Sequence, residues 1–295
     1  VILEWKNDSN LIFRKKIEID NDYLFKINQE VINNSLNQVE LYPYAQLTRK
    51  NKPEDLKGFY ILHEGFIAVL DEELKEDDYD DVEEKKIIRE ADKGWIGLTD
   101  KYWMTALIPE AGEKFKTTFL YQDSYKANFL LNTPKIIKPS STTNNEIKIF
   151  VAAKEVQTID TYAEEENIEK LDLIIDWGWF YFFTKPLFFA VDYLFKLTGN
   201  FGIAIVLITI MIRLIFFPLA NYSFKSMAKM KALQPEMTRL KDIHKDDKVK
   251  LQQAMMALYK KEQINPASGC LPVLIQIPFF FAIYKMLFIS LEMRH

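Results

Sequence analysis

The stretch "TIMIRLIFFPL", residues 209–219, places one arginine inside an otherwise apolar run. It belongs to a segment of nineteen residues, Phe201 to Leu219, in which Arg213 is the only charged side chain. At about 1.5 Å per residue, a helix of this length approaches the roughly 30 Å hydrocarbon thickness of a bilayer. We therefore predict a membrane-spanning helix, and its buried cation needs an explanation.

Charge divides the 295-residue chain into two parts. Residues 1–175 contain 23 Lys and Arg against 34 Asp and Glu, a net charge of −11. Residues 176–295 contain 15 against 8, a net charge of +7, and they hold all the long uncharged runs. This asymmetry predicts an acidic soluble domain followed by a membrane domain. The single cysteine, Cys270, excludes an internal disulfide.

The first domain, residues 1–175, has the pattern of an all-β sandwich. Short β-branched and aromatic stretches, several alternating in polarity, lie between turn residues. These stretches are residues 16–20, 23–28, 59–62, 66–70, 116–121 and 147–152. The acidic run 71–86 lacks the spacing of a calcium loop and is interpreted as a solvated loop. Residues 156–172 have helical character and predict a helical linker out of the domain.

The second part is predicted to contain four segments. Residues 176–198 are rich in aromatic side chains but carry charges and a proline, which favours an amphipathic helix in the membrane interface over a spanning one. Residues 199–222 are predicted to form a transmembrane helix. Residues 223–265 follow as a helical hairpin, and residues 266–295 contain a second transmembrane helix.

The connector between the two spans predicts the topology. Residues 223–265 carry ten basic and five acidic side chains. Short connectors rich in Lys and Arg stay in the cytoplasm, so the acidic first domain is expected on the opposite side. Apolar residues recur in this connector in steps of three and four, which predicts two antiparallel helices with a heptad-like seam. They are Met230, Leu233, Met237 and Leu240, then Leu251, Met255 and Leu258.

Arg213 has two ordinary explanations and one functional one. An arginine near the centre of a transmembrane helix costs about 2.5–3.5 kcal/mol on insertion scales. The side chain could snorkel toward the cytoplasm or join an ion pair, although the second span offers no acid. The functional hypothesis is that the guanidinium lies in a water-filled recess and binds an acidic or polar ligand. Thr209, one turn earlier, would share that face, and we place Gln276 of the second span in the same substrate-binding site.

Five of the nine methionines lie in the hairpin, namely Met227, Met230, Met237, Met255 and Met256. Flexible thioethers suit a surface that accommodates many apolar sequences. Core packing is the default role for Met230, Met237 and Met255, whereas Met227 and Met256 are freer to contact a client. We predict that the five together form a client-capture surface.

Signatures of catalysis are sparse. His63, His244 and His295 are scattered, and the chain has no nucleotide-binding Walker A sequence. We therefore assign no catalytic residue, no cofactor and no metal site, and we expect no enzyme activity.

Several blocks of sequence resemble one known family. They are "DWGWFYFFTKPLF", "GNFGIAIVLITIMIRLIFFPL", "SMAKMKALQPEM", "QQAMMALYKKEQINPASGCLPVLIQIPFFFAIYKML" and "SLEMRH", with "KGWIGLTDKYWMTALIPE" in the first domain. These blocks are similar to blocks of the bacterial YidC insertases of the YidC/Oxa/Alb family, which insert membrane proteins. The resemblance covers nearly the whole chain.

The resemblance implies a periplasmic β-sandwich of the β-supersandwich kind, an interfacial helix, and an α-helical insertase core with a cytoplasmic hairpin. The groove arginine of that family matches Arg213. Against that pattern the chain is expected to lack the first transmembrane helix, the opening strands of the periplasmic domain and the last three core helices.

The partners implied are nascent inner-membrane proteins, the Sec translocon and membrane lipid, with the ribosome as a further candidate and no small-molecule substrate. The implied location is the bacterial inner membrane, as a multi-pass protein with residues 1–175 periplasmic and 223–265 cytoplasmic. The alternative from another class is a membrane-tethered carbohydrate-binding or mutarotase-like enzyme, suggested by the acidic sandwich domain.

Overall fold

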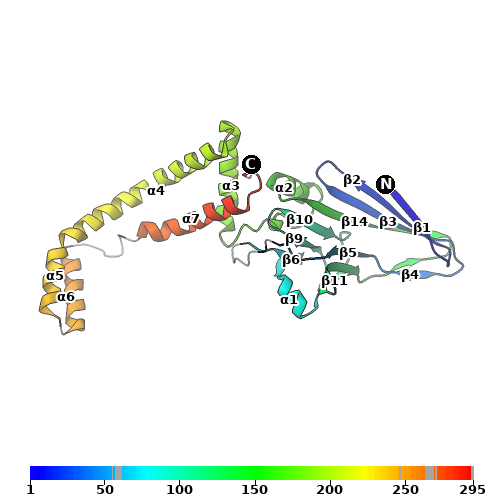
Figure 1. Ribbon diagram of the computed structural model, residues 1–295, viewed down its shortest axis with the longest axis horizontal. Helices are drawn as coiled ribbons and strands as arrows, with labels where there is room; N and C mark the ends of the chain where they lie inside the picture. The colour runs from blue at the N-terminus through cyan, green and yellow to red at the C-terminus, as the bar shows by residue number, and fades with distance from the viewer. Residues whose placement is uncertain (55, 57–61, 246, 263–268, 270, 294–295) are drawn as a thin grey trace. The chain divides into compact units, whose positions relative to one another are not determined.

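The computed structural model describes residues 1–295 except 55, 57–61, 246, 263–268, 270 and 294–295 (Figure 1). Part of the predicted strand at 59–62, and both Cys270 and His295, lie outside the described residues. The chain forms two compact units. One consists of Val1–Gly178 with Ile289–His295, and the other is Trp179–Phe288.

The first unit is built on an eight-stranded sheet in which each neighbouring pair of strands is antiparallel. In order across the sheet, the strands are β1 (Ile2–Lys6), β2 (Leu11–Ile19), β3 (Leu24–Asn33), β14 (Ser141–Ala153), β10 (Trp103–Ile108), β9 (Gly94–Thr99), β6 (Gly65–Leu70) and β7 (Glu73–Asp77). β3 and β14 pair over ten residues although they are far apart in sequence, so long-range contacts fix this sheet.

A four-stranded sheet completes the sandwich. Its strands are β5 (Tyr44–Arg49), β12 (Tyr125–Leu131), β11 (Phe115–Tyr121) and β8 (Ile87–Ala91), and a two-stranded ribbon joins β13 (Lys135–Ile137) to β4 (Val39–Leu41). Side chains from both sheets form one buried core. Among its largest members are Phe66, Ile96, Leu107, Phe115, Phe119, Phe129 and Leu131. The prediction of an all-β sandwich is confirmed.

The acidic run 71–86 is not a loop, so that interpretation is wrong. It contains β7 and a short helix, α1 (Tyr79–Glu84). β7 pairs with β6, which supplies backbone hydrogen bonds that the local sequence does not reveal. Several of these acids form ion pairs, and buried Asp77 accepts two hydrogen bonds of 2.6 and 2.7 Å from Arg89. Among the described residues no cluster of ligands suits a metal ion.

The predicted helical linker forms α2 (Val156–Glu165) and a 3₁₀ turn, η1 (Leu171–Ile174). α2 packs on the large sheet, where the ring of Tyr162 lies 5.9 Å from that of Phe150. Just after the helix, the Glu166 carboxylate bridges Lys26 on β3 (2.7 Å) and Lys148 on β14 (2.8 Å). This bridge ties the end of α2 to the two central strands.

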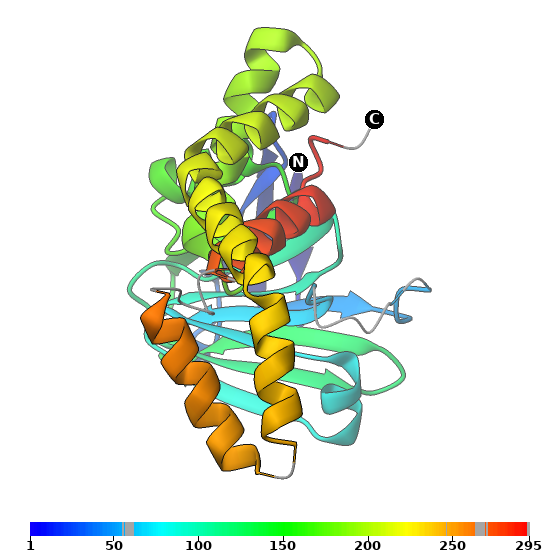
Figure 2. The same cartoon turned by 90° about the vertical axis from the view of Figure 1, so that its left-hand side faces the viewer.

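The second unit is helical. Its helices are α3 (Tyr181–Thr198), α4 (Phe201–Ala232), α5 (Gln234–Ile243), α6 (Lys248–Lys261) and α7 (Leu271–Ile289). α5 and α6 lie side by side as a hairpin (Figures 1 and 2). α4 differs from the expected division at residue 222, because it continues unbroken for 32 residues into the hairpin region. It ends when Pro235, at the start of α5, cannot donate a helical hydrogen bond.

We predict that Glu166→Gln weakens the sandwich in a pH-dependent way. The Lys148 and Lys26 ammonium groups hold the pKa of the Glu166 carboxyl below its usual 4.5. Its ionised form therefore stabilises the fold above pH 4.5, and this stabilisation disappears as the pH falls through the lowered pKa. The variant should lose about 1 kcal/mol at pH 7 relative to wild type, and the difference should shrink toward pH 3.

Urea unfolding followed by near-ultraviolet circular dichroism measures the two free energies. Glu165→Gln is the control, because Glu165 is an exposed neighbour with no ion pair to a described residue. A difference that stays constant from pH 7 to pH 3 would contradict the role assigned to the bridge.

Candidate functional site on the apolar helices and the basic hairpin

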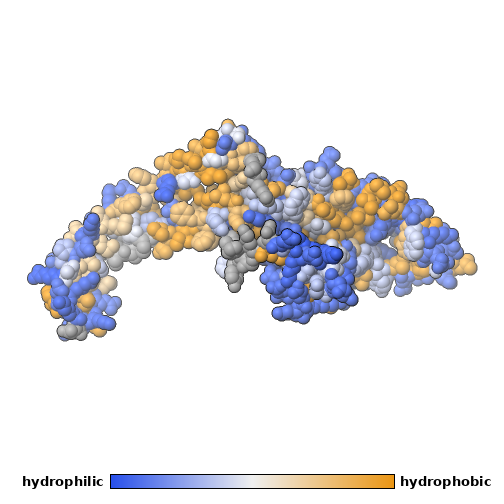
Figure 3. Space-filling model, viewed as in Figure 1, coloured by the Kyte–Doolittle hydropathy of each residue, from blue (hydrophilic) through white to orange (hydrophobic). Residues whose placement is uncertain are grey.

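Two described helices are long and apolar enough to cross a membrane. They are α4 and the Pro272–Ile289 part of α7, judged by length and composition. Figure 3 shows apolar side chains over α4 and α7, and hydrophilic ones over α5 and α6. At about 1.5 Å per residue α4 extends about 48 Å, more than the roughly 30 Å of hydrocarbon in a bilayer. One continuous helix therefore carries both the apolar span and the first basic residues of the hairpin region.

The start of α4 is fixed by a polar cap. Gly199 ends α3 in the left-handed region, with φ of 68°, which a residue with a side chain rarely adopts. Asn200 then accepts a hydrogen bond from the Ile203 N–H at 3.1 Å. The rings of Phe195 on α3 and Phe201 on α4 stack across the turn between the two helices, with their centroids 3.8 Å apart. The turn between α3 and α4 sets the first residue of α4 and hence the position of every side chain along the helix.

Arg213 lies twelve residues into α4, about 18 Å along the axis. Its side chain is exposed and has no hydrogen bond or ion pair with another described residue. Neither α4 nor α7 contains an aspartate or glutamate. Thr209, also exposed, donates its hydroxyl to the Ile205 carbonyl at 2.7 Å, so it offers a ligand only its acceptor lone pairs. Arg213 is thus the cation available on this face.

Gln276 is half-buried on α7. Three residues further along α7, the ring of Phe279 lies 5.0 Å from Phe216 of α4 and 4.6 Å from Phe183 of α3. Phe216 is itself three residues after Arg213, and residues at this spacing are neighbours on a helix surface. The aromatic contact therefore joins the helices that carry Arg213 and Gln276. Sequence reasoning missed these phenylalanines, because their contact depends on how three helices pack.

The hairpin methionines differ in exposure. Met237 and Met255 are half-buried along the seam, and the Tyr259 hydroxyl lies 3.9 Å from the Met237 sulfur. Met230 is also half-buried, whereas Met256 is 61% exposed. Met256 is thus the hairpin methionine most open to an incoming chain.

The base of the hairpin is held by contacts that the sequence did not predict. The buried Ser223 hydroxyl donates to the Gly269 carbonyl at 2.8 Å. A side chain at position 269 would meet the Cγ of Met227 at 3.1 Å, so glycine permits this close approach. Met227, 40% exposed, therefore also packs against the returning chain.

The second helix of the hairpin begins with an acidic cap. Asp247 accepts a hydrogen bond from the Lys250 N–H at 3.0 Å, and the Lys250 ammonium lies 3.2 Å from the same carboxylate. These interactions, the backbone one foremost, hold the pKa of Asp247 below its ordinary value. The cap fixes where the tip ends and α6 begins.

A β-sandwich domain joined to two apolar membrane-length helices with a basic helical hairpin between them defines a membrane protein of two parts. The family model described as YidC periplasmic domain matches residues 1–190, and that described as 60Kd inner membrane protein matches residues 193–295. The chain belongs to the YidC family of membrane protein insertases.

The chain is similar to curated relatives and to one solved structure of this family. The membrane protein insertase YidC of Pelagibacter ubique (strain HTCC1062) is 56% identical over 295 residues, which is 100% of this chain and 53% of the relative. The membrane protein insertase YidC of Brucella melitensis biotype 1 is 46% identical over 301 residues, which is 100% of this chain and 49% of the relative. A crystal structure of an active YidC insertase is 17% identical, with 99% and 59% coverage and a TM-score of 0.36. The chain spans about half the length of the curated relatives it matches.

We predict that Asn200→Ala loosens the start of α4. Losing the cap should cost about 1 kcal/mol, because the Ile203 N–H loses its acceptor. Hydrogen exchange at the Ile203 amide should then accelerate about fivefold, whereas Asn200→Ser, which restores a capping oxygen, should exchange at the wild-type rate. Equal rates in all three proteins would show that the turn between α3 and α4 does not depend on this cap.

Proposed function

We propose that the full protein containing this chain inserts inner-membrane proteins into the bilayer and helps them fold, through a hydrophilic groove that contains Arg213. The observation that carries this proposal is a cation on an apolar, membrane-length helix with no acidic partner on either apolar helix. Such a side chain persists within a bilayer where water or a ligand solvates it. Membership of the insertase family supports the same conclusion.

The physical task is to move a polar segment past hydrocarbon. Burying an apolar helix in lipid is favourable, but the polar flank that must cross loses its hydrogen bonds to water at several kcal/mol per group. A water-filled recess at the level of Arg213 shortens the distance that the polar flank travels through hydrocarbon. Thr209 and Gln276 add hydrogen-bonding groups to the walls, while the apolar client segment leaves along exposed aliphatic side chains such as Leu214 and Ile215.

Arg213 acts on acidic flanks in particular. A guanidinium binds a carboxylate through two parallel hydrogen bonds, so it can hold an acidic residue as the flank enters. With the cytoplasm negative, about 100 mV then favours outward transfer of each carboxylate by about 2.3 kcal/mol. No nucleotide site is needed for this step.

The hairpin is proposed to receive the client first. Its exposed Met256 and partly exposed Met227 offer adaptable apolar contacts, and half-buried Met230, Met237 and Met255 hold the two helices together while they support that surface. Its basic residues fit a cytoplasmic location, where a nascent chain emerges. We further propose the Sec translocon and the ribosome as partners, and a multi-pass topology with residues 1–175 in the periplasm, residues 176–198 in the interface and residues 223–265 in the cytoplasm.

Membership of the insertase family favours insertion over the alternative of a membrane-tethered carbohydrate-binding or mutarotase-like enzyme. His63, the histidine of the sandwich domain, is held in a structural setting. Its ring contacts the Phe66 carbonyl at 2.8 Å and lies 3.4 Å from Asp78.

We predict that Arg213→Ala slows insertion of clients with acidic translocated tails about fivefold, the factor expected when an ion contact of about 1 kcal/mol is lost. Arg213→Glu should be worse because it repels the tail, and Arg213→Lys milder because it keeps the charge but loses the planar fork. Protease protection of clients in proteoliposomes of the full-length protein measures the rate.

A client with a neutral tail and the variant Lys225→Ala, which removes an exposed cation farther along α4, serve as controls. Both should leave insertion close to the wild-type rate. The mechanism fails if Arg213→Ala inserts every acidic-tailed client as fast as wild type.

We also predict that deleting residues 225–263 abolishes crosslinking of stalled nascent chains to the protein. The deletion removes the methionine surface but leaves the core of the sandwich, whose contacts lie within the first unit, intact. Near-ultraviolet circular dichroism of the deleted protein should still report a folded sandwich. Undiminished crosslinking would refute capture by the hairpin.

A further inference from the structure

The chain leaves the first compact unit after Gly178 and returns to it at Ile289, and a carboxylate bound to backbone N–H groups lies near each crossing. At the first crossing, Asp176 accepts two such hydrogen bonds of 3.1 and 3.0 Å. At the second, Glu292 accepts one of 2.9 Å from the N–H of Val156, which is 136 residues earlier in the chain. Glu292 thus joins the segment after α7 to the first residue of α2.

The N-terminal end of α2 has no cap of its own. Glu155, the residue before the helix, makes no side-chain capping hydrogen bond, and its carboxylate instead accepts from the Thr158 hydroxyl at 3.2 Å. The first turn of α2 contains no acid, and Val156 is only 2% exposed. A buried N–H needs an acceptor, and a carboxylate at a helix N-terminus also interacts favourably with the helix dipole. Glu292 supplies the acceptor that the local sequence lacks.

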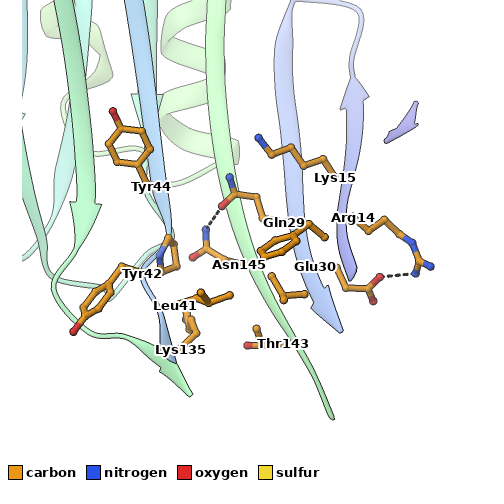
Figure 4. A pocket seen from close by; sticks show the side chains of 13 residues that line it. Arg14, Lys15, Gln29, Glu30, Leu41, Tyr42, Tyr44, Lys135, Thr143 and Asn145 are labelled. Atoms are coloured by element: carbon orange, nitrogen blue, oxygen red, sulfur yellow. Dashed lines mark hydrogen bonds and ion pairs between the residues drawn. The ribbon is translucent and has the colours of Figure 1, made fainter. Parts of the chain in front are cut away.

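The helix that receives this carboxylate lies on a well-fixed sheet. The Glu166 bridge ties the C-terminal end of α2 to β3 and β14. The strands are in turn joined by side chains as well as by their backbones (Figure 4): Asn145 on β14 donates to Gln29 on β3 at 3.3 Å, and Arg14 on β2 pairs with Glu30 on β3 at 2.6 Å. Cross-strand pairs of this kind stabilise a sheet. The capped helix therefore provides a firm point of attachment.

The segment after α7 is buried from its first residue. Ile289, where α7 ends, is 4% exposed and Ser290 is 6% exposed, whereas Leu287 is 38% exposed. Ile289 and the residues that follow it belong to the first unit. The end of α7 is thus the place where the returning chain begins to pack as part of the sandwich unit.

We propose that Glu292 and the N-terminal end of α2 form an intramolecular clasp through which the sandwich domain holds the end of α7. The carboxylate is the anchor and the Val156 N–H is the group that binds it. One consequence rests on the proposed function: α7 carries Gln276, and a helix held at its end moves this side chain less relative to Arg213. Glu292 is in this sense a positioning residue, because it acts on the groove through α7.

Double electron–electron resonance measures the clasp in the full-length protein in proteoliposomes. Nitroxide labels are attached to Thr161→Cys on α2 and Leu287→Cys on α7, both at exposed positions, with the native cysteines replaced by serine. Without further changes we expect one narrow distance distribution. Glu292→Ala should at least double its width, because the end of α7 is then released. Glu292→Gln keeps an oxygen acceptor and should remain close to the unchanged protein.

A variant of the donor tests the other half of the clasp. Val156→Pro removes the N–H at the first helical position, where proline is favoured. Glu155 before it has φ of −79° and ψ of 122°, which a following proline accepts. The distribution should widen as in Glu292→Ala, and the double variant should widen it no further, because both changes break one interaction.

Two control variants should keep the distribution narrow. Val156→Ala retains the N–H, and Glu165→Ala removes an exposed acid from the same helix. Circular dichroism checks folding, and the Glu292 variants decide the matter if Val156→Pro does not fold.

Insertion by the same proteins tests the positioning role. Glu292→Ala should raise the client concentration for half-maximal insertion about threefold and leave the maximal rate unchanged, because a looser α7 must be ordered each time a client binds. Glu292→Gln should restore the wild-type concentration. A simple loss of folded protein would lower the maximal rate instead.

Three results would overturn the clasp. They are a broad distribution in the protein with Glu292 and Val156 unchanged, an equally narrow one in Glu292→Ala, and a narrow one in folded Val156→Pro. A widened distribution with an unchanged half-maximal concentration would overturn the positioning role. If the wild-type protein inserts no client, the proposed function fails, and the distance measurements still decide whether the clasp exists.

Discussion

The free energy of hydrating one guanidinium is the constraint on which the membrane part of this chain depends. At the centre of a bilayer an arginine costs about 2.5–3.5 kcal/mol on insertion scales, and a nearby carboxylate could offset this. Neither apolar helix has a carboxylate, and Arg213 has no ion pair with another described residue. In the proposed function, water or a passing client solvates the charge in a groove among the helices.

Local sequence patterns predicted the architecture where neighbouring residues decide it. Alternating apolar residues gave the strands of the sandwich, and an apolar run of membrane length gave α4. The errors lie where distant partners decide. The acidic run 71–86 forms β7 because β6 pairs with it, and no pattern within the run contains that information. α4 also runs through Pro218 and past residue 222, so the predicted boundary there is not a helix end, and its place at the membrane surface stays a prediction.

The candidate site shows the same division. Arg213 is evident from sequence, because one charge among apolar residues stands out by composition. The aromatic contact of Phe279 with Phe216 and Phe183 depends on how three helices pack, and Phe279 lies 63 and 96 residues after these partners along the chain.

The continuity of α4 links the two places where the proposed function puts a client, the hairpin and the groove. One helix of 32 residues, α4, carries both Arg213 and the base of the hairpin, so their spacing is set by the helix. At one end Asn200 fixes where the helix begins, and near the other end Ser223 and Gly269 bring the returning chain against it. The helix is interrupted at Leu233, where α4 stops and α5 begins. In the proposed function, this interruption separates the hairpin, which would meet different nascent chains, from the part of α4 that carries Arg213.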